Sequence, residues 1–264
     1  MIVLTFDTDY LSPEDLERFH ERFPFPGQGT YFLWKPFHSV RLPRQEIGLH
    51  PYLEQTERWS ETMTRFIDEL GYRPATVRPH SCVYSHFFGT ELVKFGFESI
   101  SQATYLYQTG LSAYRHPWGL WELPIYYMES MDFTYQHNWP KLGHQPFDSA
   151  VIDRSLTHPG LYVYDFHPLH VILNTSSYPQ YQSVRAELVE RGKSPFDLGF
   201  SGRGARTFFL ELVEKMQRAG VESVTCSQAV SAAARSTEAS RPASVPPLHW
   251  TGSASLTDRE ERTC

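Results

Sequence analysis

The chain has 264 residues, of which 41% are apolar and 15% aromatic, and its formal net charge is −6. A chain of this length can bury a substantial core, as one large domain or two small ones. The acidic balance argues against a general binder of nucleic acids or of anionic membranes, because no basic face dominates. No stretch approaches the roughly 20 apolar residues that a membrane helix needs, so we expect no membrane span.

The start of the chain and its cysteines indicate a cellular compartment. The segment "MIVLTFDTDY" lacks the basic region and the long apolar core of a signal peptide. Cys82, Cys226 and Cys264 are far apart and odd in number, so they form no zinc-ribbon or redox pair and suit a reducing compartment. We therefore expect a cytoplasmic protein.

Short apolar runs alternate with amphipathic stretches through the first half of the chain. Residues 1–6 predict a strand, and Ser12 followed by Pro13 predicts the start of a helix, because serine caps helices and proline suits their first turn. The further elements are, in order, strands at 30–34 and 45–49, a helix at 59–70 ended by Gly71, a strand at 75–78, a helix around 90–95 and a strand near 97–101.

The second half continues this alternation. In order it predicts a strand at 120–127, a helix at 147–156, a strand at 160–166, a loop-rich stretch, a helix at 205–219 ended by Gly220, a strand at 221–226 and a short helix capped by Ser227. About eight strands alternating with helices predict the α/β class, as a single distorted (β/α) barrel of about seven to eight parallel strands over residues 1–230. Residues 231–264 are rich in Ser, Ala, Pro and Thr, which predicts a flexible tail.

Polar side chains stand at or just past the carboxyl ends of several predicted strands. In a barrel these ends converge on one face, where the active sites of such folds are built. Acids, histidines and an arginine from separate strands would therefore meet there. In chain order the residues are Asp7, Asp9, His50, Arg78, His80, Glu129, Asp132, Asp165 and His167.

These residues also have plain structural interpretations. The two aspartates could cap the turn into the next helix, and His50 could be an ordinary loop histidine. Arg78 could form a structural ion pair, and His167 and His170 could be packed imidazoles. None of these interpretations predicts clustering at strand ends, so the joint pattern favours a functional site.

The motifs that carry these residues resemble those of the polysaccharide deacetylase family with the NodB homology domain, carbohydrate esterases that remove acetyl groups from sugars. "TFDTD" resembles the first motif of the family, "EIGLH" the second, "RPH" the third and "YDFH" the fifth. A subgroup associated with bacterial surface-polysaccharide assembly is more similar still, through an R-x-H segment and the ending "FHPLHVILNT". The likeness runs from Ile2 to about Val230.

The resemblance implies the main catalytic roles. Asp7 would be the general base, Asp9 and His50 would hold a divalent metal, expected to be zinc, and His167 would be the general acid. Arg78 would pair with Asp7 and keep it ionised. Side chains along an extended chain alternate with a period of two, so Asp7 and Asp9 are expected to point the same way.

Other residues take supporting roles in the resemblance. Glu129 or Asp132 lies where the family places groups that orient catalytic side chains, and Asp165 is a candidate partner of His167. The residues expected to bind the substrate are Asp132, His170 and Asn174.

The second motif departs from the pattern of the family. A second histidine commonly follows four residues after the first, and this chain has Glu54 there. Either Glu54 is the third metal ligand, or His80 reaches the metal from the next strand. Imidazole is the commoner zinc ligand, which favours His80.

We therefore expect a metal-dependent N-deacetylase acting on an acetamido sugar in surface-polysaccharide (lipopolysaccharide O-antigen) biosynthesis. The missing export signal favours a nucleotide-linked, lipid-linked or oligosaccharide substrate over mature cell wall. Two alternatives stay open: a hydrolase of a non-sugar amide C–N bond, and a non-catalytic carbohydrate-binding barrel. A pure binder has no use for a paired base and acid, so Asp7 and His167 count against the last. The oligomeric state is not predicted.

Overall fold

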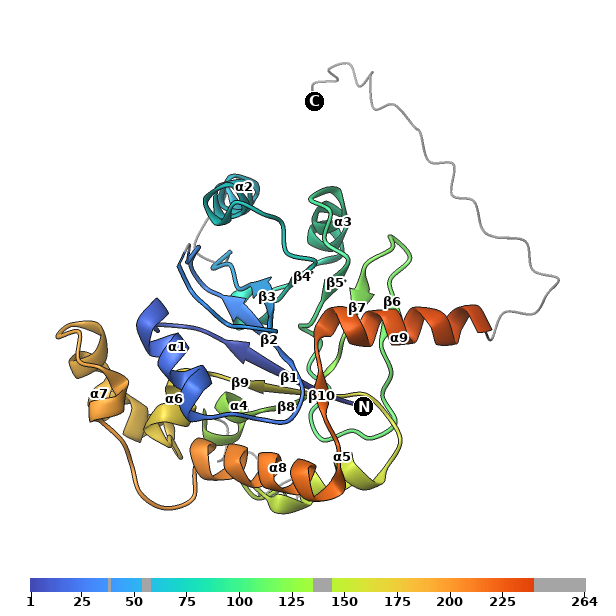
Figure 1. Ribbon diagram of the computed structural model, residues 1–264. Coiled ribbons are helices and arrows are strands. Elements are labelled where there is room, and N and C mark those ends of the chain that lie inside the picture. Colours follow the sequence, from blue (N-terminus) through green and yellow to red (C-terminus); the bar gives the residue numbers. More distant parts are fainter. Residues whose placement is uncertain (38, 54–57, 135–143, 240–264) are drawn as a thin grey trace, which may run out of the picture.

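The structure, a computed structural model, describes residues 1–37, 39–53, 58–134 and 144–239. Within these ranges ten strands form one sheet, and helices pack around it (Figure 1). The strands are β1 (Ile2–Asp7), β2 (Gly29–Leu33), β3 (Glu46–Leu49), β4 (Thr76–Val77), β5 (Ser99–Ile100), β6 (Tyr114–Arg115), β7 (Trp121–Glu122), β8 (Ile125–Met128), β9 (Tyr162–Phe166) and β10 (Ser223–Val224). The α-helices are α1 (Pro13–Arg22), α2 (Trp59–Leu70), α3 (His86–Lys94), α4 (Glu129–Thr134), α5 (Ser149–Thr157), α6 (Pro168–Leu173), α7 (Tyr178–Val189), α8 (Ala205–Ala219) and α9 (Cys226–Ala239).

The sheet is built around β1. Nine strands follow one another in the order β6-β7-β5-β4-β3-β2-β1-β9-β8, and β10 also pairs with β1. In register, Leu4 of β1 lies opposite Gly29 of β2 on one side and Tyr164 of β9 on the other. The five central strands, from β4 to β9 in this order, are all parallel. Their carboxyl ends therefore lie along one edge of the sheet.

The predicted α/β class is confirmed. The sheet is a curled half barrel of mostly parallel strands, and the closure of the predicted distorted (β/α) barrel is not confirmed. β6 and β7 pair in antiparallel fashion. One isolated parallel bridge, between Thr104 and Ile125, links the segment after β5 to β8.

Predicted helix boundaries agree with the structure at Ser12, Gly71 and Gly220. The last helix differs, because Ser227 lies inside α9 and the Thr225 hydroxyl caps it by accepting a hydrogen bond from the Gln228 amide at 3.2 Å. The Ser12 side chain accepts a hydrogen bond from the Asp15 amide at 3.1 Å at the start of α1. Gly71 and Gly220 end α2 and α8 with φ values of 80° and 64°. This left-handed backbone is favourable for glycine, which has no Cβ to clash.

Two regions differ from the prediction. The single strand predicted at 120–127 is two strands, β7 beside β5 and β8 beside β9, separated by Leu123 and Pro124. Proline has no N–H to donate to a ladder, which suits a break at this point. The loop-rich stretch contains α6 and α7. All six residues of α6 are buried and none of α7 is, so neither helix shows the one-sided pattern that reveals a helix in sequence.

The predicted start of the tail needs correction. α9 runs to Ala239, so residues 231–239 continue a helix. Its buried residues, Cys226, Ala229 and Val230, all lie in the first half, and the exposed second half lacks the apolar residues by which a sequence reveals a packed helix. Residues 240–264 of the predicted tail lie outside the described residues.

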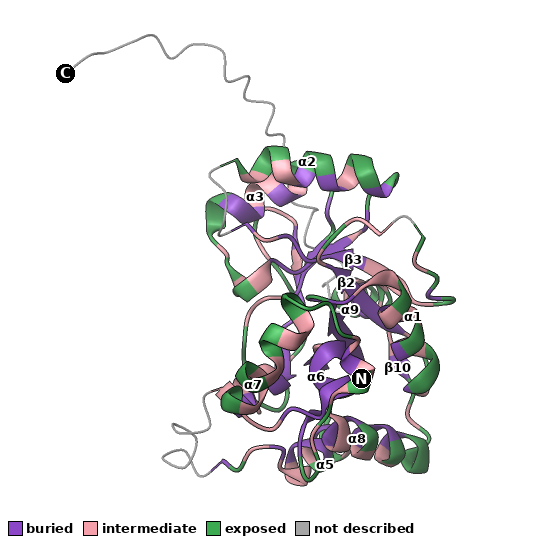
Figure 2. Ribbon diagram, turned by 90° about the vertical axis from the view of Figure 1, so that its left-hand side faces the viewer, coloured by how far each residue is buried: buried purple, intermediate pink, exposed green. Residues whose placement is uncertain are grey.

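Buried residues gather in the strands and on the inner faces of the helices, and exposed residues on the outer faces of α2, α7 and α8 (Figure 2). A second, smaller apolar cluster includes Val3, Phe32, Val163 and Cys226. In the described part of the chain, no helix combines the length and the apolar character required to cross a bilayer.

Candidate active site

The edge formed by the carboxyl ends of the central strands carries most of the predicted site residues. Asp7 is the last residue of β1, and Asp9 follows two residues later. His50 comes directly after β3, Arg78 directly after β4, and His167 directly after β9. Because these strands are neighbours in the sheet, the five side chains are brought together from four separate segments of sequence.

Arg78 is a fully buried anchor beneath this edge. Its guanidinium donates hydrogen bonds to Asp7 at 3.0 Å and to the Thr5 hydroxyl at 2.9 Å. It also donates to Asp165 and, at 2.7 Å, to the Ser101 carbonyl. Burial lowers the pKa of Arg78, but the two carboxylates outweigh this effect and raise it. The contact with Asp7 expected from the sequence is therefore present, and it holds that carboxylate in a fixed orientation.

Asp165 does not pair with His167, the partner considered from the sequence. Its side chain is fully buried, bonds to Arg78 and accepts a hydrogen bond from the Thr5 hydroxyl at 3.2 Å. Thr5 and Asp165 are direct neighbours in the register of β1 and β9, so both side chains face the interior. Burial raises the pKa of Asp165, against the opposing effect of Arg78.

Asp9, His50 and His80 form the one group of potential metal ligands found among the described residues. One ligand atom from each lies within 4.8 Å of the others. His50 Nδ1 lies 2.8 Å from the Arg78 carbonyl oxygen, which can only accept, so Nδ1 carries the hydrogen. Nε2 then faces Asp9 Oδ2 at 3.4 Å, and it is buried without a hydrogen-bond partner. A backbone partner of this kind is what fixes the tautomer of a metal-binding histidine.

His80 is held toward the other two ligands by its surroundings. The Tyr52 ring stacks on the His80 ring with a centroid distance of 3.9 Å and an interplanar angle of 9°. The Tyr52 hydroxyl donates to Asp9 Oδ1 at 2.6 Å. Ser81 and Cys82 have φ values of 55° and 52°, so the chain turns sharply after His80. The sequence analysis missed Tyr52, although its place two residues after His50 was the available signal.

His167 is oriented by Glu129, at the start of α4. Its Nδ1 lies 2.8 Å from Glu129 Oε1, and its Nε2 lies 3.5 Å from Asp9 Oδ2. The same Glu129 oxygen accepts a hydrogen bond from the His167 amide at 2.8 Å. Burial lowers the pKa of His167, but the Glu129 carboxylate outweighs it and raises that pKa well above its usual value. Of the two acids considered as orienting groups, Glu129 is therefore the one that contacts His167.

The charge and donor set at this edge fit a divalent cation. Asp7, Asp9, Glu129 and Asp165 are buried carboxylates, and the buried guanidinium of Arg78 pairs with two of them, Asp7 and Asp165. Burial raises the pKa of Asp9, but nearby histidines and the Tyr52 hydroxyl hold it well below its usual range. One carboxylate and two imidazoles are ligands that Zn²⁺ takes in tetrahedral sites with an open fourth position. A cation there would balance the excess of buried negative charge.

Two predicted substrate residues, Asp132 and Asn174, have hydrogen-bond partners within the fold. Asp132 is fully buried and accepts hydrogen bonds from Tyr107, from His144 at 2.8 Å and from the Phe147 amide at 3.1 Å. Asn174 ends α6 with a φ of 58°. Its amide group donates to the carbonyls of residues 200 and 202, and its oxygen accepts from the amide of residue 207. A substrate contact by either side chain stays a prediction.

Two further predicted residues are His170, expected to bind the substrate, and Glu54, the alternative metal ligand. His170 is buried and lines a cavity of about 260 Å³ together with Asp9, His80 and His167. Burial and the neighbouring His167 lower the pKa of His170 well below its usual value, so its ring is neutral. Glu54, the alternative metal ligand, lies outside the described residues.

A second cavity, of about 430 Å³, shares His80 and His167 with the first. Asp7, His50 and His167 line it, together with Thr104 and Met128. The proposed base, acid and metal ligands therefore line two adjoining cavities. The arrangement combines a positioned carboxylate, a positioned imidazole and a group of potential metal ligands, which are the groups that hydrolysis of an acyl bond can use.

Comparisons with known proteins place this geometry in a family. A family model described as "WbmS-like: Polysaccharide deacetylase" matches residues 4–185. A crystal structure from Bordetella bronchiseptica, described as a polysaccharide deacetylase involved in O-antigen biosynthesis, is 23% identical over 81% of this chain and 90% of that chain, with a TM-score of 0.64. The peptidoglycan deacetylase PdaC from Bacillus subtilis is 16% identical over 90% of this chain and 93% of that chain, with a TM-score of 0.43. No curated protein sequence matches significantly.

These findings support a hydrolase of the carbohydrate esterase type. The chain belongs to the polysaccharide deacetylase family. The resemblance found in the sequence motifs is thereby confirmed.

Proposed function

We propose that the chain is a metal-dependent N-deacetylase that removes the acetyl group of an acetamido sugar in the synthesis of a bacterial surface polysaccharide. The observation that carries this proposal is the meeting of Asp7, Asp9, His50, His80 and His167 at one edge of the sheet. The link to surface polysaccharide rests on the similarity to the Bordetella protein described with O-antigen biosynthesis.

In this proposal Asp9, His50 and His80 hold the cation, with zinc favoured by the two imidazoles. When bound, such a cation polarises an acyl carbonyl and makes a water molecule more acidic. The buried and unpartnered Nε2 of His50 is the clearest structural support for this assignment. His80, and not Glu54, is proposed as the third ligand because its ring lies within reach of the other two.

The proton transfers are assigned to two side chains. Asp7, fixed by Arg78 at 3.0 Å, accepts the proton of the attacking water as the new C–O bond forms. His167, fixed by Glu129 at 2.8 Å, gives a proton to the sugar nitrogen as the C–N bond breaks. Acetate and a free amine leave. The Glu129 carboxylate raises the pKa of His167, which favours the protonated ring that a general acid requires.

The first test is the metal content of purified protein, measured by elemental analysis. Wild type is expected to hold about one divalent ion per chain. Asp9→Ala, His50→Ala and His80→Ala should each lose it, and Glu54→Ala should retain it. His158→Ala, at an exposed position on the α5 side, is the matched control and should behave as wild type.

Each outcome of this test separates the candidate functions. If Glu54→Ala lost the metal and His80→Ala retained it, Glu54 and not His80 would be the third ligand. A wild type that takes up no metal would favour the non-catalytic carbohydrate-binding barrel. A loaded wild type that releases no acetate from acetamido sugars, but cleaves other amides, would favour the hydrolase of a non-sugar C–N bond.

A further inference from the structure

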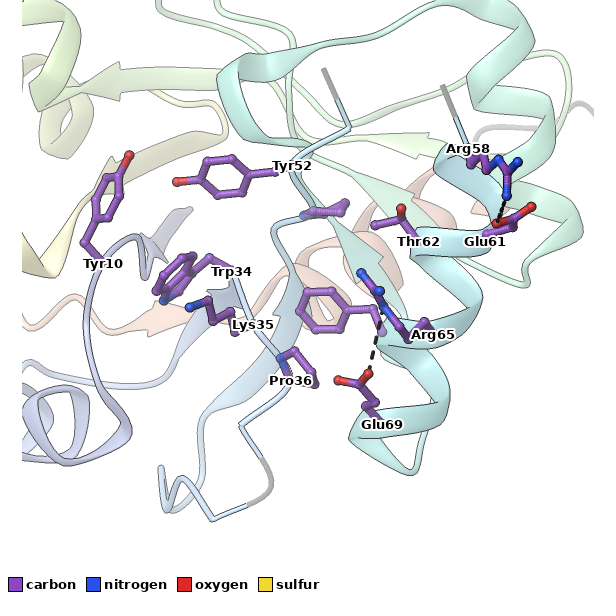
Figure 3. Close-up of a pocket in the computed structure, with 12 residues that line it drawn as sticks. Tyr10, Trp34, Lys35, Pro36, Tyr52, Arg58, Glu61, Thr62, Arg65 and Glu69 are labelled. Carbon is purple, nitrogen blue, oxygen red and sulfur yellow. Dashed lines mark hydrogen bonds and ion pairs between the residues drawn. The ribbon is translucent and has the colours of Figure 1, made fainter. Parts of the chain in front are cut away.

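One fully buried carboxylate has no role in the proposed chemistry. Glu122 is the last residue of β7 and has no exposed surface. It contrasts with the open groove beside α2, which Tyr10, Trp34 and Tyr52 line next to the cluster (Figure 3). Burial of a charged group is costly unless the group is paired and hydrogen-bonded. The partners of Glu122 therefore show what the fold gains from this residue.

Glu122 holds the segment that follows β5. In register it lies opposite Ile100, the last residue of β5. Its Oε1 accepts hydrogen bonds from the amides of Gln102 at 2.9 Å and of Ala103 at 3.0 Å. Its Oε2 accepts from the Gln102 side chain at 3.1 Å, and His116 Nε2 lies 3.6 Å from the same oxygen. Three N–H donors on one carboxylate fix the path of the chain just past β5.

The same segment carries Ser101, which is fully buried and bonds to Arg78 twice. The Ser101 carbonyl accepts a hydrogen bond from Arg78 Nε at 2.7 Å, and the Ser101 hydroxyl accepts one from Nη2 at 2.8 Å. The hydroxyl in turn donates to the Leu123 carbonyl at 2.8 Å. Leu123 directly follows Glu122, so the end of β7 supports residues 101–103 at three successive positions.

Arg78 divides its donors between this segment and the proposed base. Nε and Nη2 donate to Ser101, and Nη1 donates to Asp7 at 3.0 Å. A guanidinium is planar and rigid, so fixing two of its nitrogens also fixes the direction of the third. The position of Nη1, and with it the orientation of Asp7, therefore depends on residues 101–103.

We propose that Glu122 and Ser101 are positioning residues for Asp7, on which they act through Arg78. Glu122 fixes residues 101–103, these residues fix the guanidinium, and the guanidinium fixes the carboxylate that accepts the proton of the attacking water. This inference rests on the proposed function for the role of Asp7 as the base. It gives the reaction a dependence on β7, which carries none of the motifs that mark the site in the sequence.

The first measurement follows the guanidinium itself, independently of turnover. Exchange of the Arg78 Nε–H with solvent is measured by NMR on nitrogen-15-labelled protein, and the signal is identified by its loss in Arg78→Lys. Glu122→Gln replaces one acceptor oxygen by an NH₂ group, so at least one bond to residues 101–103 is lost. We expect this exchange to become about tenfold faster or more, since a hydrogen bond to a charged group is usually worth at least this factor.

Ser101→Ala is the milder variant, because it removes a single oxygen atom and leaves Arg78 Nη2 without its acceptor. It should also accelerate the exchange, and it keeps the test decisive if Glu122→Gln fails to fold. Ser155→Ala is the matched control. Ser155 is a buried serine of α5 that bonds to the Ile152 carbonyl and the Tyr164 hydroxyl, so its loss should lower the Tm without changing the exchange at Arg78.

The second measurement separates positioning from stability. In steady-state assays of acetate release, Glu122→Gln and Ser101→Ala are expected to lower kcat about 10–100-fold, since a misplacement of about 1 Å can cost about 100-fold in rate. KM and metal content should stay at the wild-type level, because neither variant changes a proposed metal ligand or a residue lining the cavities at the cluster. Ser155→Ala should retain the wild-type kcat.

Two results would overturn the assignment. One is an exchange rate at Arg78 that both variants leave unchanged, and the other is a wild-type kcat in variants whose exchange has become faster. A metal-loaded wild type that releases no acetate is a different failure. If the exchange still accelerated in both variants, the support of Arg78 by Glu122 and Ser101 would stand, and the deacetylase would be rejected.

Discussion

Tyr52 contacts two of the three proposed metal ligands at once, through its hydroxyl to Asp9 and through its ring to His80. Groups that orient metal ligands typically change metal affinity by 10–100-fold when they are replaced. We expect Tyr52→Phe to weaken Zn²⁺ binding about tenfold, and Tyr52→Ala to weaken it further because the stacking is lost as well. Competition with a chromophoric chelator measures both constants.

The matched control for this prediction is Tyr72→Phe, which removes a hydroxyl from a half-exposed ring outside the site. It should bind Zn²⁺ as wild type does. Equal affinity of Tyr52→Phe and wild type would mean that the hydroxyl does not orient Asp9.

Glu129 acts on the reaction through His167. Its carboxylate is fully buried and accepts hydrogen bonds from both the ring and the amide of that residue. Glu129→Gln keeps the shape but removes the charge that raises the pKa of His167, so the acid is lost at neutral pH. We expect kcat to fall about 10²–10⁴-fold, the usual contribution of general acid–base catalysis, while the metal content stays at the wild-type level.

Steady-state assays of acetate release, combined with elemental analysis, check this expectation. Glu98→Gln, an exposed glutamate next to β5, is the control and should be unaffected. If Glu129→Gln lost its metal, the residue would have to be assigned to metal binding instead of to orientation of the acid.

At the scale of elements, the close packing of β3 against β2 and β4 explains why position 48, in "EIGLH", is a glycine. A Cβ on Gly48 would lie 2.5 Å from Cδ1 of Phe32 and 3.0 Å from Cγ2 of Thr76. Phe32 is fully buried, and the Arg78 guanidinium lies 4.5 Å from its ring centroid. The small residue therefore lets β2, β3 and β4 bring His50 and Arg78 to the same edge.

We expect Gly48→Ala to lower the free energy of unfolding by about 1–3 kcal/mol, the range for overpacking a filled core. Urea denaturation followed by fluorescence measures the change. Because the clash is with the Phe32 ring, Phe32→Leu in the same chain should recover part of the loss, as a double-mutant cycle would reveal. Additive effects of the two substitutions would contradict this account.

At the scale of the whole molecule, the start of α9 closes the end of the sheet opposite the active site. The Cys226 amide donates to the Thr30 hydroxyl at 2.9 Å, and the Ser227 amide and hydroxyl both donate to Glu46. Thr30 and Glu46 lie at the amino-terminal ends of β2 and β3. Cys226 also packs in the smaller apolar cluster with Val3 and its neighbours.

Two truncations test which part of the carboxyl-terminal segment the fold requires. A chain ending at residue 239 retains every contact described here, so its Tm should equal that of the full chain. A chain ending at Thr225 loses the buried start of α9, and we expect its Tm to fall by several degrees, or by about 4 °C for each kcal/mol lost. Calorimetry measures both, and an unchanged Tm for the shorter chain would exclude the closing role of α9.

The order of the main elements could be predicted because local signals mark them. The helix α8 has one apolar face and ends at Gly220, and β1 and β9 are mostly apolar runs in which every residue is buried. α6 and α7 could not be found, since one is buried on all sides and the other has no buried face. Amphipathic patterning detects only the elements that lie between core and solvent.

By itself the sequence determined the family, the α/β class and the principal polar residues, because strand ends, caps and short motifs are local properties of a chain. Only the tertiary structure decided the partners: Asp165 with Arg78, Glu129 with His167, and Tyr52 with both Asp9 and His80. It also showed the partners of Asp132 and Asn174 within the fold. Such pairings depend on strand order and on which direction each side chain faces, and both are set by how distant segments pack.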